Sequence, residues 1–161
     1  MRPVTIPLSK TRSEVLLVDD NPADVDLIRE ILGSCKHHYH VSSVNDGEDA
    51  ISFLHRRGEY SEAPCPDLVI LDLNLPRKDG RAVLKELKSD SLFYKIPVVV
   101  FTTSQASSDI SSSYALGANC YIQKPVDFDQ FRNTVKSVGF YWLLINQAPM
   151  TVGAAKGATH S

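Results

Sequence analysis

Five polar residues follow or close short apolar runs of the sequence: Asp19, Asp20, Asp72, Thr102 and Lys124. If those runs are parallel strands, all five side chains meet at one edge of a sheet. Carboxylates packed together repel one another and are driven toward protonation unless a cation lies between them. Oxygen ligands that leave positions open for water and phosphate oxygens suit Mg²⁺. The spacing therefore predicts a Mg²⁺ site that accepts a phosphoryl group.

The same residues suit nucleophilic chemistry at phosphorus. Lys124 supplies a positive point charge, and Thr102 a hydroxyl donor, for the equatorial oxygens of a phosphoryl group in transfer. A carboxylate that Mg²⁺ and Lys124 keep ionised can attack phosphorus and form an acyl phosphate. Taken singly, Asp19 and Asp20 could cap a helix before Pro22, and the others could be ordinary strand and surface residues. Their joint placement at strand ends favours chemistry.

The elements that position these residues alternate between short apolar runs and amphipathic segments. The runs at 15–18, 67–73 and 97–102 are apolar at almost every position, as strands covered on both faces are. Amphipathic stretches such as 22–32 and 82–88 separate them, which is the pattern of βα units. The sequence predicts an α/β, flavodoxin-like doubly wound fold, in which a five-stranded parallel sheet and five helices form a three-layer sandwich.

The composition indicates one domain: 161 residues, 43% hydrophobic, with a formal net charge of -2. Lysine and arginine are scattered, which argues against nucleic acid as a direct partner. Cys35, Cys65 and Cys120 form no CxxC pair, so disulfides and zinc are disfavoured and a cytoplasmic location is expected. The sequence has no export signal and no apolar stretch near the ~18 residues that span a bilayer, so no membrane partner is expected.

We expect the domain to span residues 14–146, with an N-terminal arm at 1–13 and a disordered, aperiodic tail at 147–161. The connection at 56–66 is longer than most links between a helix and a strand, and reads as an ordered insertion or a surface excursion. No second domain is expected after Ile145. Output must then occur by contact with other proteins.

Four segments resemble, in order, the receiver domains of two-component response regulators: VLLVDDNPADVDLIREIL, LDLNLPRKDG, VVVFTTS and CYIQKPVDF. The resemblance implies that Asp72 is the phosphorylated aspartate. It implies that Asp20 binds Mg²⁺ directly and that Asp19 reaches the ion directly or through water. It also implies that the backbone carbonyl of Asn74 faces the metal.

The resemblance further implies a conformational switch. Lys124 pairs with the phosphoryl oxygens, and its peptide bond to Pro125 is expected to be cis. The hydroxyl of Thr102 moves toward the phosphoryl group, and the ring of Tyr121 turns inward behind it. Thr103 departs from the small residue common at its position, which bears on the lifetime of the phosphoryl group.

Finer resemblance is to the single-domain regulators that pair with bacterial phytochrome kinases. The partners it implies are a sensor histidine kinase of phytochrome type and, as a further candidate, a histidine phosphotransfer protein. The last helix, predicted over 127–145, carries more apolar residues than one face can bury, among them Phe140, Tyr141 and Leu144. Surplus apolar surface marks an interface, so we expect a homodimer through this helix.

An alternative is a Mg²⁺-dependent aspartyl-phosphate phosphatase of the haloacid dehalogenase type, which also uses an Asp, a Thr and a Lys. Such enzymes place the nucleophile after their first strand and need a second acid where this chain has Asn74. A flavin or nucleotide module is disfavoured because no Gly-rich loop follows the first strand. We therefore expect no enzymatic activity beyond self-phosphorylation from small donors and autodephosphorylation.

Overall fold

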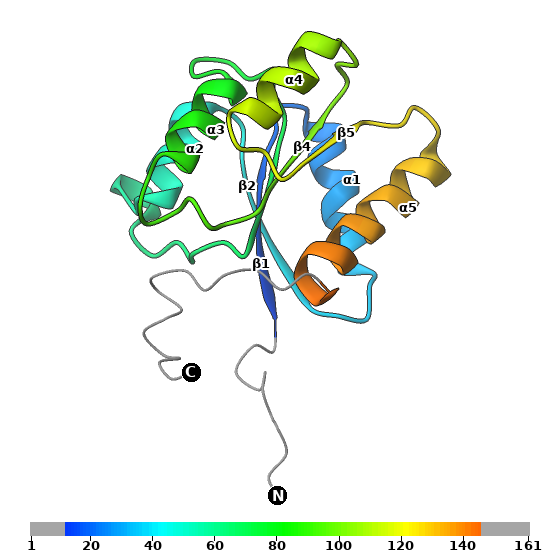
Figure 1. Ribbon diagram of the computed structural model, residues 1–161. Helices are drawn as coiled ribbons and strands as arrows, with labels where there is room; N and C mark the ends of the chain where they lie inside the picture. Colours follow the sequence, from blue (N-terminus) through cyan, green and yellow to red (C-terminus); the bar gives the residue numbers. More distant parts are fainter. Residues whose placement is uncertain (1–11, 146–161) are drawn as a thin grey trace, which may run out of the picture.

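The computed structural model describes residues 12–145. The expected tail at 147–161 and residues 1–11 of the expected arm lie outside the described residues, and Ser13 is already the first residue of a strand. The described residues form one sheet with helices on both faces (Figure 1). No helix within this part of the chain is long and apolar enough to cross a lipid bilayer.

Neighbouring strands are all parallel, and their order across the sheet is β2-β1-β3-β4-β5. The strands are β1 (Ser13–Val18), β2 (Tyr39–Val44), β3 (Leu68–Leu71), β4 (Val98–Thr102) and β5 (Cys120–Gln123). The helices are α1 (Pro22–Gly33), α2 (Gly47–Leu54), α3 (Gly80–Lys88), α4 (Ser107–Ala115) and α5 (Phe128–Gly139). This strand order is that of flavodoxin-like sheets. The predicted fold class is confirmed.

Alternate residues of the inner strands are buried against opposite helix layers. Val15 and Leu17 of β1 belong to the core under α1 and α5, whereas Leu16 and Val18 belong to the core under α2 and α3. Figure 1 shows α1 and α5 on one face of the sheet and α2, α3 and α4 on the other. Burial on both faces explains why β1 is apolar at every position from Val15 to Val18. It also fixes the register, since a slip by one residue would exchange the two sets.

The start of α1 is set by a side chain that accepts hydrogen bonds from the exposed backbone N–H groups of the first turn. The Asn21 side chain accepts from the N–H groups of Ala23 and Asp24 at the start of α1, and Pro22 occupies the first turn. The cap of α1 is therefore Asn21, and neither Asp19 nor Asp20. The helix-cap explanation for these two carboxylates is wrong.

The last predicted helix differs from the structure. Instead of one helix over 127–145, α5 ends at Gly139 and a π-helical segment, η3 (Phe140–Ile145), follows. Glycine weakens the α-helix, and a Cβ at Gly139 would lie 3.1 Å from the Tyr39 hydroxyl, so a larger residue there would make the neighbouring side chains shift by a few tenths of an ångström. The wider π turn changes the direction in which the aromatic residues after Gly139 project.

The connection at 56–66 is an ordered insertion. It contains the 3₁₀ turn η2 (Gly58–Tyr60), entered through a positive φ of 56° at Arg56 and 57° at Gly58. The Tyr60 ring packs 5.5 Å from the ring of Phe53 in α2, and Ala63 is buried. The insertion therefore adds an aromatic side chain to the α2 layer.

Candidate functional site

The polar residues singled out in the sequence meet at the carboxyl edge of the sheet. Asp19 and Asp20 follow β1, Asp72 follows β3 and Lys124 follows β5. Carboxylate oxygens of the three aspartates lie within 4.8 Å of one another. The Nζ atom of Lys124 lies 2.8 Å from Asp19 and 3.2 Å from Asp72. The predicted convergence is found because parallel strands end at a common edge.

Lys124 has a third carboxylate partner that sequence reasoning missed. Its Nζ also donates to Asp24 Oδ2 at 2.8 Å. Burial alone would lower the pKa of Lys124, but hydrogen bonds to Asp19 and Asp24 outweigh that effect and raise it. Lys124 is therefore a firmly protonated ammonium with one proton for each of three carboxylates. The position of Asp24 in the first turn of α1, next to the Asp pair, was the available signal.

Burial makes the charged form of the Asp19 carboxylate unfavourable. Burial raises its pKa, although hydrogen bonds from Lys124 and from the Asn21 backbone N–H act in the opposite direction. Asp20, by contrast, is exposed. An all-oxygen donor set with one buried and one exposed carboxylate beside Asp72 fits a hard divalent cation such as Mg²⁺, which keeps several waters.

Thr102, the last residue of β4, carries an unsatisfied hydroxyl. The residue is fully buried, and its Oγ1 has no hydrogen-bond partner among the described residues. An unpaired buried hydroxyl costs roughly 1–3 kcal/mol, so it calls for an explanation. A ligand with acceptor oxygens at this edge of the sheet would supply the missing partner.

Tyr121 and Asn74 lie near the predicted site but make other contacts. The Tyr121 hydroxyl donates to the carbonyl of Ser104 at 2.9 Å, and its ring is half-buried. The backbone N–H of Asn74 donates to Asp72 Oδ1 at 3.3 Å. The roles of the Asn74 carbonyl and of the Tyr121 ring remain predictions.

The expectation of a cis peptide bond before Pro125 is wrong, because the described residues contain none. For bonds to proline the trans form is favoured by roughly 0.5–1 kcal/mol. With a trans bond, the Lys124 backbone N–H donates to the Thr102 carbonyl at 2.7 Å, and its Nζ still reaches all three carboxylates.

A network that the sequence did not reveal joins α3 to α4 beside this site. Arg81 in α3 donates to Asp79 and to Asp109 in the first turn of α4. Asp109 also accepts from the Ser104 hydroxyl at 2.6 Å, and Ser104 is the residue whose carbonyl holds Tyr121. Ser104 thus connects the loop after β4 to both α4 and β5.

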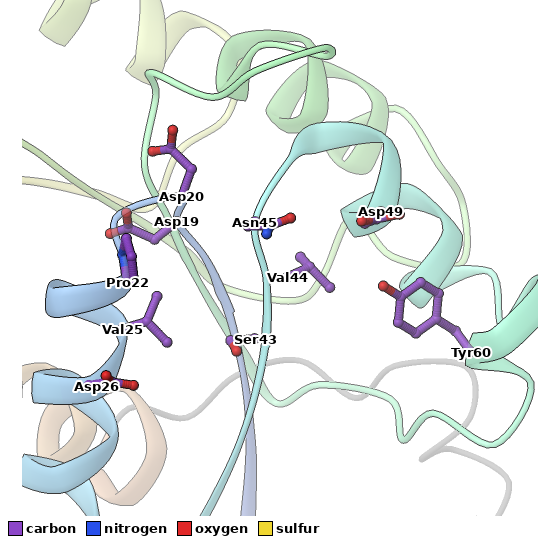
Figure 2. Close-up of a pocket in the computed structure, with 10 residues that line it drawn as sticks. All are labelled: Asp19, Asp20, Pro22, Val25, Asp26, Ser43, Val44, Asn45, Asp49 and Tyr60. Carbon is purple, nitrogen blue, oxygen red and sulfur yellow. The ribbon is translucent and has the colours of Figure 1, made fainter.

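A cavity of about 400 Å³ opens from the acidic cluster and extends between α1 and α2. Figure 2 shows Asp19 and Asp20 at one end, Ser43 and Asn45 along the end of β2, and Tyr60 at the far side. The insertion at 56–66 therefore supplies one wall of the cavity through Tyr60.

Gly80, the first residue of α3, allows the chain after Asp72 to fold back tightly. A Cβ there would lie 2.3 Å from the carbonyl oxygen of Asp72 and 2.7 Å from the Cα of Leu73. Both contacts are with backbone, which cannot swing aside. We expect Gly80→Ala to lower the free energy of unfolding by about 2 kcal/mol, measured by urea denaturation. Gly33→Ala is the control, because nothing lies within 4 Å of its added Cβ; equal stability of the two variants would contradict the close approach.

Comparison with known proteins matches residues 15–136 to the family described as the response regulator receiver domain. Response regulator Rcp1 of the cyanobacterium Synechocystis is 41% identical over 129 residues, covering 80% of this chain and 88% of the relative. The phosphorylated cyanobacterial phytochrome response regulator RcpA superposes with a TM-score of 0.83 at 45% identity, covering 86% of this chain and 99% of that one.

A solved structure of Rcp1 contains Mn²⁺; it superposes with a TM-score of 0.81 at 39% identity, covering 85% of this chain and 99% of that one. Together with the aspartate cluster, it confirms the expectation of a divalent metal ion at this edge of the sheet. The dehalogenase-type phosphatase alternative finds no support among these relatives. The chain belongs to the response regulator receiver domain family.

Proposed function

We propose that Asp72 is the phosphoryl acceptor of a response regulator whose domain spans residues 14–146 and whose donor is a sensor histidine kinase. The observation that carries this proposal is the position of Asp72, 3.2 Å from the Lys124 ammonium and within one cluster with Asp19 and Asp20. A bound Mg²⁺ would neutralise charge on the phosphoryl oxygens. An oxygen of Asp72 forms the new P–O bond while the P–N bond of a phosphohistidine breaks and its electron pair leaves with the donor.

The remaining site residues divide the tasks of binding and response. Asp20 and Asp72 would hold a Mg²⁺ ion through carboxylate oxygens, Asp19 would reach it directly or through water, and Asn74 would add its backbone carbonyl. Lys124 binds a phosphoryl oxygen as a point charge. The unpaired hydroxyl of Thr102 gains an acceptor when the phosphoryl group arrives, which gives the switch a driving force.

The response runs through Ser104. If the loop after β4 moves toward the phosphoryl group with Thr102, the Ser104 carbonyl leaves the Tyr121 hydroxyl and frees the ring to turn inward. The loop is held by Asp109, at the start of α4. Ser113 is the one buried residue of α4, so this helix is weakly held and can repack at little cost.

The direct test is incubation of the protein with Mg²⁺ and acetyl phosphate. We expect a base-labile adduct that saturates at one phosphoryl group per chain and needs the metal ion. Steady release of phosphate over many turnovers would instead indicate a phosphatase. No adduct with either acetyl phosphate or a phosphorylated kinase would overturn the proposal.

The kinase is proposed to be of phytochrome type. RcpA is a phytochrome response regulator, and bacteriophytochrome response regulators are among the similar structures at 37% and 38% identity. We further propose a cytoplasmic protein without nucleic-acid or membrane partners. Phosphotransfer rates from a phytochrome kinase and from a histidine phosphotransfer protein, measured side by side, decide which of the two is the donor.

A homodimer through the C-terminal helix is the proposed route of output. Phe140 and Tyr141 of η3 are 53% and 49% exposed. Tyr141 and Trp142 also line a mainly apolar groove of about 410 Å³ against β5, which is an edge strand of the sheet. Large exposed aromatic side chains beside an apolar groove are typical of an interface.

The dimer predicts a specific effect of charge at Tyr141. We expect Tyr141→Glu to weaken self-association at least about tenfold, because a carboxylate would be desolvated at the interface. Sedimentation at tens of micromolar measures it. Tyr94→Glu is the matched control, since Tyr94 is 47% exposed but lies between α3 and β4. A monomeric wild type, or equal loss in both variants, would contradict the interface.

A further inference from the structure

We propose that Asp24 is a positioning residue that competes with the phosphoryl group for the ammonium of Lys124, and so limits how tightly the site holds that group. The inference rests on the proposed function of Asp72 as the acceptor. It concerns a carboxylate on α1 that is outside the cluster of three aspartates assigned to the metal ion.

The first observation is that all three N–H donors of the Lys124 ammonium already make hydrogen bonds. An ammonium has three donors, and each is engaged by a different carboxylate. The contacts with Asp19 and Asp24 are 2.8 Å long, whereas the contact with Asp72 is 3.2 Å. The ammonium is therefore drawn toward β1 and α1 and away from the acceptor.

The second observation is which partner can be released. The side chain of Asp19 is 1% exposed, so the loss of its lysine would leave a buried, unpaired charge. The side chain of Asp24 is 23% exposed, so water can replace the lysine there. When a phosphoryl group on Asp72 presents several acceptor oxygens, Asp24 is the partner that Lys124 gives up.

If Asp24 competes for Lys124, weakening its hydrogen bond should strengthen binding of the phosphoryl group. Asp24→Asn keeps the shape of the side chain and an acceptor oxygen, but replaces a charge-assisted hydrogen bond by a weaker neutral one. Lys124 then transfers to the phosphoryl group at a smaller cost. If Asp24 merely supported Lys124, the same substitution would weaken phosphoryl binding.

The test is a titration of the protein with beryllofluoride in Mg²⁺, followed by NMR. We expect Asp24→Asn to bind about fivefold more tightly than wild type, from the difference between charged and neutral hydrogen bonds. Asp26→Asn is the matched control: it removes the same charge two residues along α1, from an exposed residue that makes no contact with Lys124. We expect it to bind as wild type does.

A second measurement separates action through Lys124 from a general effect of charge. In a Lys124→Ala background, Asp24→Asn should no longer change the affinity for beryllofluoride. Affinity of Asp24→Asn equal to or weaker than that of Asp26→Asn would overturn the inference, as would an effect that persists without Lys124. Failure of the wild type to bind beryllofluoride in Mg²⁺ would instead overturn the proposed acceptor function, and the role of Asp24 with it.

Discussion

Replacement of Asp72 by asparagine is expected to abolish labelling by acetyl phosphate, because an amide oxygen is neither a nucleophile for phosphorus nor a charged ligand for Mg²⁺. The labelled fraction should fall from saturation to background. The fold should survive, because the amide oxygen can still accept from Lys124 and one source of repulsion with Asp19 disappears. Intact-protein mass spectrometry and urea denaturation measure the two effects.

The control for this variant is Asp49→Asn. Asp49 lines the same cavity and its carboxylate is partly exposed, but it belongs to α2 and lies outside the aspartate cluster. The Asp49→Asn variant should be labelled by acetyl phosphate to the same extent as the wild type. Stable, base-labile labelling of Asp72→Asn would show that another residue accepts the phosphoryl group, and the site assignment would be wrong.

The sequence allowed the fold and most of the site to be predicted because both follow from the same physical rule. The inner strands β3 and β4 and most of β1 are buried on both faces and apolar, so they could be found by composition. The edge strands β2 and β5 are more polar, and were placed by the alternation of apolar runs and amphipathic segments. Parallel strands end at one edge, so Asp19, Asp72 and Lys124 could be placed together without knowledge of their contacts.

Features that depend on packing between distant elements could not be predicted. The contact between Asp24 and Lys124 joins residues 100 positions apart, and depends on how the first turn of α1 lies relative to the end of β5. The contact between Arg81 and Asp109 likewise depends on the distance between α3 and α4. Charged residues on helices are usually solvated, so nothing in the sequence indicated either contact.

Two other errors had local causes. The bond before Pro125 was expected to be cis through resemblance alone, and nothing in the neighbouring residues specifies it. The apolar pattern after residue 127 is continuous, so periodicity could not locate the change at Gly139. The structure shows the change directly, because α5 ends at Gly139 and the π-helical segment η3 follows.

Replacement of Lys124 by alanine is expected to separate phosphorylation from response. The nucleophile and the metal ligands remain, so labelling by acetyl phosphate should continue, slowed by a factor of roughly 10² for the loss of one charged donor. Without the ammonium, the phosphoryl group stays bonded to Asp72 but loses the contact that orients it, and the changes at Thr102 and Tyr121 should fail to follow. Fluorescence of Trp142, the single tryptophan of the chain, reports the response in η3, which directly follows α5.

The same variant tests how the site balances charge. Lys124 and Asp19 are almost fully buried, and removal of one partner of a buried ion pair costs about 3 kcal/mol. We therefore expect Lys124→Ala to be destabilised by that amount without metal ions and substantially restored by Mg²⁺, whose charge replaces that of the ammonium. Lys85→Ala, which changes an exposed lysine of α3, should neither destabilise the protein without metal ions nor make its stability depend on Mg²⁺. Full response in labelled Lys124→Ala would contradict the role of the ammonium in the response, and no rescue by Mg²⁺ would contradict its role in balancing the charge of the site.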